Sequence, residues 1–76
     1  NVNLYPNPVL NNLNFTNLNE VDKIQIMGLT GEILIDFSPK SKAEKLDVSK
    51  ISEGIYIAKI IDEQGDYVSK RFVKGY

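Results

Sequence analysis

The sequence has no cysteine, no histidine and no tryptophan. Without cysteine the chain can form no disulfide and offers no thiol, and without histidine it lacks the residue on which most catalytic triads and zinc sites depend. Carboxylate pairs remain available for acid–base chemistry, but no pattern places two acids in one cleft. We therefore predict that the protein is not an enzyme and has no catalytic residue, no bound metal and no cofactor.

Excess charge of either sign is also missing. The formal net charge of −1 provides no electrostatic attraction to nucleic acid, so we expect no nucleic-acid partner. The distribution is uneven, since residues 1–38 carry one base and four acids, whereas residues 39–76 carry eight bases and six acids. The bases become denser towards the C-terminus. A solvent-exposed strand edge protected by lysines accounts for this gradient without any partner.

No hydrophobic run approaches the ~20 residues that cross a bilayer, so we expect no membrane insertion by the chain itself. Its 76 residues suit one domain, spanning 1–76. The chain begins with Asn1 rather than Met, which suggests a part cut from a longer polypeptide. Any export signal would then lie on the missing part.

Short runs of β-branched and aromatic residues, separated by turn residues, predict strands. Leu13 and Phe15 alternate with polar residues, as do Ile24 and Ile26, which indicates strands with one buried face. The run Ile55–Ile61 is apolar on both faces apart from its lysine, and it predicts a central strand covered on both sides. Further strands are expected around the following segments: Val2–Leu4, Ile33–Phe37, Leu46–Val48 and Tyr67–Val73. About seven strands predict an all-β fold, a small Ig-like antiparallel β-sandwich.

Glycine and short polar segments mark the turns. Gly28–Gly31 and Glu63–Asp66 predict hairpins, and Ser38–Ser41 predicts a loop between sheets. Residues 47–52 are compatible with a single helical turn capped by an aspartate or serine. All eight asparagines fall within residues 1–19, which predicts a turn-rich start to the domain.

Three motifs follow one another in a fixed order. Tyr5-Pro6-Asn7-Pro8 is a rigid corner, because proline fixes φ and removes a backbone donor. Gly54-Ile55-Tyr56 begins the central strand, where the glycine indicates a positive φ or a close backbone approach. The chain nearly ends with Lys70-Arg71-Phe72-Val73-Lys74. Each motif alone is common in β-sandwiches.

Together they resemble the type A C-terminal sorting domain of the type IX secretion system of Bacteroidota. The resemblance covers Asn3 to Lys74, with Ile51 where the family usually has leucine and with Gly75-Tyr76 after the final lysine. It marks the following residues as the family's structural positions: Pro6, Asn7, Pro8, Gly31, Gly54 and Tyr56.

The resemblance implies an Ig-like domain that does no chemistry and directs its N-terminal cargo across the outer membrane. The cargo would pass through the periplasm and end at the outer-membrane surface or outside the cell. The implied partners are the translocon and shuttle proteins of the outer membrane and a surface sortase, which usually removes the domain. We predict that the translocon reads the last strand, at Lys70, Arg71, Phe72, Val73 and Lys74.

Two other readings are open. A structural or carbohydrate-binding module would present exposed aromatic rings, and the candidates are Tyr5, Tyr56, Tyr67 and Tyr76. A calcium loop at 62–66 would need six to eight oxygen ligands, and this segment lacks the spacing of an EF-hand.

Overall fold

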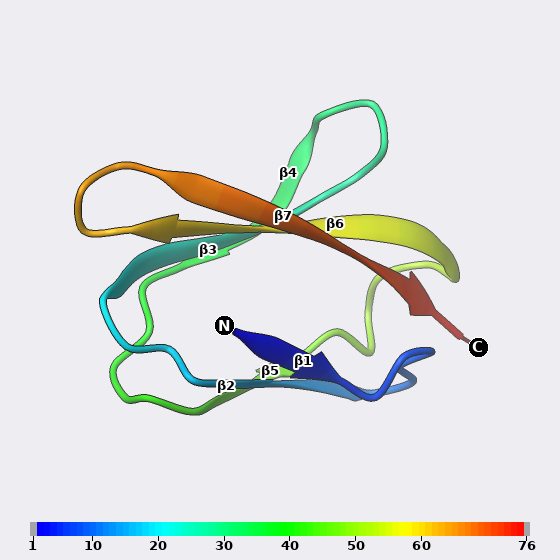
Figure 1. Ribbon diagram of the computed structural model, residues 1–76. Helices are drawn as coiled ribbons and strands as arrows, with labels where there is room; N and C mark the ends of the chain where they lie inside the picture. Colours follow the sequence, from blue (N-terminus) through cyan, green and yellow to red (C-terminus); the bar gives the residue numbers. More distant parts are fainter. Residues whose placement is uncertain (1, 76) are drawn as a thin grey trace.

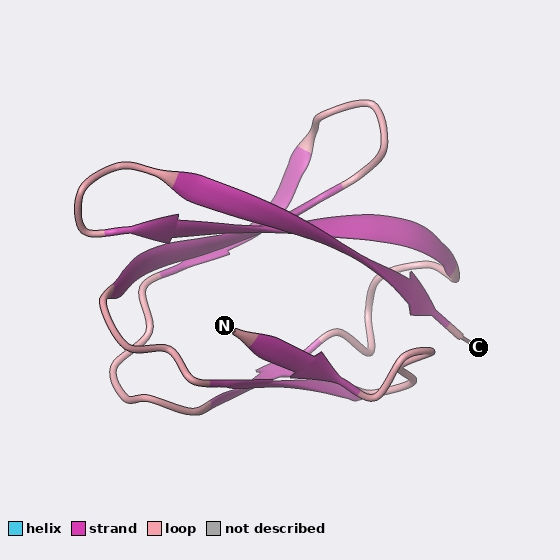
Figure 2. Ribbon diagram, viewed as in Figure 1, coloured by secondary structure: helices cyan, strands magenta, loops and turns pink. Residues whose placement is uncertain are grey.

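The computed structural model describes residues 2–75, and within them every regular element is a β-strand (Figure 2). The seven strands are β1 (Asn3–Tyr5), β2 (Asn12–Thr16), β3 (Val21–Met27), β4 (Ile33–Phe37), β5 (Glu44–Asp47), β6 (Gly54–Asp62) and β7 (Tyr67–Lys74). The predicted all-β class and number of strands are confirmed. No helix long and apolar enough to cross a membrane occurs in this part of the chain.

The strands form two sheets that face each other as the layers of a sandwich (Figure 1). One sheet has the order β1-β2-β5 and the other the order β4-β3-β6-β7, and all pairs within them are antiparallel. The architecture agrees with the small Ig-like sandwich that was predicted. Strands β1 and β7 are the edge strands on the same side, the near side of Figure 1.

The core lies between the sheets and is built from alternate residues of each strand. Leu13 and Phe15 of β2 face Ile24 and Ile26 of β3, and all four side chains are fully buried. The rings of Phe15 and Phe37 meet edge to face, with centroids 6.2 Å apart. The alternation seen in the sequence therefore identifies the inner face of both sheets.

Strand β6 is central in its sheet, as predicted, but the prediction that it is covered on both sides is wrong. Ala58 and Ile60 point into the core and are buried, whereas Ile55 on the opposite face is 44% exposed. Ile57 on that face is half-buried. The sandwich has only two layers, so the outer face of β6 is shielded by its neighbours in the sheet alone.

The loops agree with the turn residues in most places. Gly31 donates its N–H to the carbonyl of Gly28 at 3.0 Å and has a φ of +94°, which favours glycine. The loop at 38–41 links β4 to β5 and so connects the two sheets.

The segment after β5 forms a hydrogen-bonded turn instead of a helical one. Asp47 accepts the N–H of Ser49 at 2.8 Å, and Val48 accepts the N–H of Ile51 at 3.2 Å. The hydrogen bonds from Ser49 lower the pKa of the Asp47 carboxyl below its ordinary value, with a smaller contribution from the charge of Lys50.

Candidate functional site

The predicted recognition residues alternate between the two faces of edge strand β7. Phe72 is fully buried and Lys74 is 6% exposed, because both side chains point between the sheets. Arg71 and Val73 lie on the outer face and are exposed. Lys70 shares the inner face but lies nearer the open side of the sandwich, where it is half-buried. The motif is therefore partly core and partly surface.

Phe72 is held by the tyrosine of the glycine-x-tyrosine motif. The rings of Tyr56 and Phe72 stack with centroids 5.9 Å apart, and the Tyr56 hydroxyl donates to the carbonyl of Ser52 at 2.6 Å. Gly54 begins this strand with a φ of +150°, a value that side-chain-bearing residues rarely adopt. These contacts link the second motif to the third and hold β6 against β7.

The proline corner closes the C-terminal end of the same strand. Strand β1 ends at Tyr5, and the Asn7 side-chain oxygen accepts the N–H of Val73 at 2.8 Å. The N–H of Val9 donates to the Val73 carbonyl at 2.8 Å, and Gly75 donates to the Val9 carbonyl at 2.7 Å. The first and third motifs therefore meet directly. Sequence reasoning treated Asn7 as part of a rigid kink and missed its contact with β7.

Lys74 is the one buried charged or polar side chain among the described residues. It lies beside the proline corner, because Val9 and Lys74 form an isolated parallel β-bridge. Its ammonium donates to the carbonyl of Gly75 at 2.8 Å, so part of its hydrogen-bonding capacity is used within the domain.

A shallow cleft lies between the edge strands β1 and β7. Its lining comes from the N-terminal segment and from β7: Val2, Asn3, Leu4, Asn7, Lys70 and Arg71. Neither Lys70 nor Arg71 has an acidic partner among residues 2–75, where the ion pair described is Lys23–Asp36. The cleft is therefore positively charged at this point.

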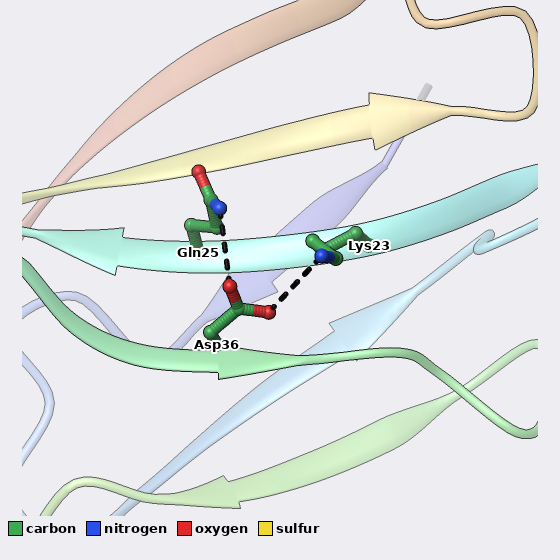
Figure 3. Close-up of polar contacts among 3 residues, drawn as sticks. All are labelled: Lys23, Gln25 and Asp36. Atoms are coloured by element: carbon green, nitrogen blue, oxygen red, sulfur yellow. Dashed lines mark hydrogen bonds and ion pairs between the residues drawn. The ribbon is translucent and has the colours of Figure 1, made fainter.

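That ion pair lies elsewhere, on the outer face of the β3–β4 ladder (Figure 3). The Lys23 ammonium is 3.7 Å from Asp36, which also accepts a hydrogen bond from the Gln25 amide at 3.2 Å. Both charged side chains are about two-fifths exposed, so the pair contributes less than about 1 kcal/mol to stability. It supports the sheet and has no geometry for chemistry.

Among residues 2–75, the exposed tyrosine rings do not gather on one face of the molecule. Tyr5 is 50% exposed and lies on the outer face of the three-stranded sheet, whereas Tyr67 is 60% exposed and lies on the outer face of the four-stranded sheet. Tyr56 stacks on Phe72 inside the sandwich, and Tyr76 lies outside the described residues. The two exposed rings therefore face opposite directions.

In the acidic hairpin at 62–66, one carboxylate forms hydrogen bonds with backbone N–H groups of the hairpin itself. The Asp62 carboxylate accepts the N–H groups of Gln64 and Asp66 at 2.9 and 3.0 Å. Within residues 2–75, no group of three or more carboxylate, histidine or cysteine side chains is placed to hold a metal ion.

In a comparison with protein families, the chain matches the secretion system C-terminal sorting domain over residues 3–74. The chain belongs to this family. The sorting domains concerned are those of the type IX secretion system, and the resemblance inferred from the three motifs is confirmed. Comparisons with curated proteins and with solved structures gave no match.

The family to which the chain belongs is not catalytic. A sorting domain marks the protein to which it is attached for secretion, so its functional groups are those that another protein can contact. In this sorting domain the accessible part of the third motif is the edge of β7 and the cleft beside it.

Proposed function

We propose that this sorting domain directs an N-terminal cargo through the outer membrane by the type IX system and is then removed by a surface sortase. The observation that carries the proposal is the family match over residues 3–74. The domain is a substrate of the machinery and catalyses nothing itself. Its cargo passes through the periplasm and is released at the outer-membrane surface or outside the cell.

The translocon or its shuttle protein recognises the last strand. Two observations support this assignment: β7 is an edge strand, and Arg71 is exposed with no ion pair among residues 2–75. A guanidinium at such a position makes charge-assisted hydrogen bonds to carboxylates, which steer association and set the orientation of the partner. Phe72 and Lys74 contribute by holding the strand, since their side chains are buried.

Export of a reporter tests the proposal. Residues 1–76 would be fused behind a signal peptide and a fluorescent protein in a Bacteroidota host. We expect the reporter on the surface or in the medium, and we expect it to remain in the periplasm when the translocon is disabled. A folded fusion that stays in the periplasm in two such hosts would refute the sorting function.

Charge reversal tests the recognition residues. We expect Lys70→Glu with Arg71→Glu to reduce export at least about tenfold, because like charges at an interface cost several kcal/mol. Lys74 is left unchanged, since a buried glutamate there would unfold the domain. The matched control is Lys42→Glu with Lys45→Glu, two exposed bases outside β7. Equal export of both variants would contradict the role of the basic residues.

A further inference from the structure

The free edge of β7 is divided into a closed part and an open part. At the closed part, Val73 uses both its N–H and its carbonyl for Asn7 and Val9. In an antiparallel pair the N–H and carbonyl of one residue point to the same side, and successive residues alternate. Because Val73 points away from β6, the N–H and carbonyl groups of Tyr67, Ser69 and Arg71 also point away from β6.

The outward groups of the open part have no hydrogen-bond partner among residues 2–75. None of the backbone hydrogen bonds outside the ladders of residues 2–75 involves Tyr67, Ser69 or Arg71. The side chains of Tyr67 and Val68 are also 60% and 55% exposed, although the Lys59 ammonium lies 4.3 Å from the centroid of the Tyr67 ring. Such a row of free donors and acceptors is a template for one additional strand.

Charge selects the kind of strand that fits. Lys70 and Arg71 lie on opposite faces of β7 at the end of the open stretch, and both line the cleft towards β1. Neither has an acidic partner among the described residues. A second copy of β7 supplies none either, because residues 67–74 contain no acid. An added strand that carries carboxylates would pair with both bases.

We propose that β7 binds an extended acidic segment of a partner protein as an added strand along Tyr67–Arg71. The corner at Asn7 and Val9 blocks pairing beyond this point and so fixes the register of the incoming strand. The inference rests on the proposed function, in which the partner is a component of the secretion machinery. It narrows the recognition surface from the whole basic motif to the stretch that ends at Arg71.

A peptide titration tests the edge without any secretion machinery. The ¹⁵N-labelled domain would be titrated with a short valine-rich peptide that carries two adjacent glutamates, one for each face of the strand, and with its glutamine counterpart. We expect chemical-shift changes at the amides of Tyr67, Ser69 and Arg71, with the amide of Val73 unchanged. The glutamine peptide should bind at least about tenfold more weakly, because charge-assisted hydrogen bonds are roughly twice as strong as neutral ones. Shifts confined to another edge, or equal affinity of both peptides, would overturn the proposal.

Export of two variants tests the edge in cells. Ser69→Pro removes an outward N–H and leaves the ladder with β6 intact, whereas Ser69→Ala keeps that N–H. We expect export to fall at least about tenfold for the proline variant and to stay unchanged for the alanine variant, with both folded by circular dichroism. Normal export of a folded Ser69→Pro fusion would overturn the edge proposal but leave the sorting function standing. If the unmodified, folded fusion stays in the periplasm in both hosts, the sorting function fails, and the peptide titration still decides the edge. The titration also decides it if Ser69→Pro does not fold.

Discussion

The two halves of β7 differ in what they do for the molecule. Over Phe72–Lys74 the inner side chains are buried and the outer backbone is bonded to the proline corner. Over Tyr67–Arg71 the side chains are mostly exposed and the outer backbone has no partner among the described residues. The basic motif therefore has two parts. Its later residues hold the strand in place, and its earlier residues are accessible to another protein. Mutations on either side should have effects of different kinds.

The largest effect is expected for Phe72→Ala in the closed half. Removal of a fully buried aromatic ring costs about 3–5 kcal/mol, which is most of the stability of a small domain. Arg71→Ala, one residue away but exposed, should change stability by less than about 0.5 kcal/mol. Urea denaturation of both variants measures the contrast. Similar losses would show that the two halves are not distinct.

A smaller effect is expected for Asn7→Ala, which removes the acceptor for the Val73 N–H. We expect a loss of about 1 kcal/mol, because water can replace part of this exposed hydrogen bond. Hydrogen exchange should show faster exchange at Val73 and no change at Ser69. Asn11→Ala is the control, since the Asn11 hydrogen bond described here is made by its backbone carbonyl. An unchanged Val73 amide would mean that the corner does not close this end.

Tyr56→Phe should lower the free energy of unfolding by about 0.5–1.5 kcal/mol, which is as much as Asn7→Ala or slightly less. The variant keeps the ring stacked on Phe72 but loses the hydroxyl bond to the Ser52 carbonyl. Tyr67→Phe, in the open half, removes a hydroxyl for which no hydrogen bond is described and should leave the urea midpoint unchanged. Equal shifts of the urea midpoint in the two variants would contradict the difference between the closed and open halves.

The smallest effect concerns Asp47, which lies on β5 in the other sheet from β7 and so serves as a reference. Hydrogen bonds from Ser49 hold its pKa below the ordinary value. Its contribution to stability is therefore complete above the pKa of the unfolded chain and is lost as the pH falls through the lower folded pKa. Asp47→Asn should make urea stability slightly less dependent on pH below about pH 4. An unchanged acid dependence would show that this carboxylate does not contribute.

Much of the fold could be predicted from local patterns. Alternation at Leu13 and Phe15, and at Ile24 and Ile26, correctly gave strands and their inner faces. The same reasoning overestimated the burial of β6, because an apolar residue such as Ile55 does not reveal whether a further layer covers it. A two-layer sandwich leaves such residues on an outer face.

The sequence predicted a candidate site on the last strand, but it did not predict which residues of that strand are buried and which are exposed. The basic motif pointed to the last strand, yet Lys74 is buried and Arg71 is exposed although both are basic residues of the same strand. That difference depends on the register with β6 and on the corner that covers Val73. The contact of Asn7 with Val73 joins residues 66 positions apart, and no local pattern indicates it.

The bridge between Val9 and Lys74 joins the beginning of the domain to its end. On a ribosome the first of these residues emerges long before the last, so the sandwich cannot close until translation is nearly complete. We expect a chain that lacks residues 67–76 to leave the edge of β6 and part of the core open, and limited proteolysis would detect this. In a protein that carries the domain at its C-terminus, a premature stop codon would then leave the sorting domain incomplete. Only a completely translated chain would therefore form the last strand and complete the sorting domain.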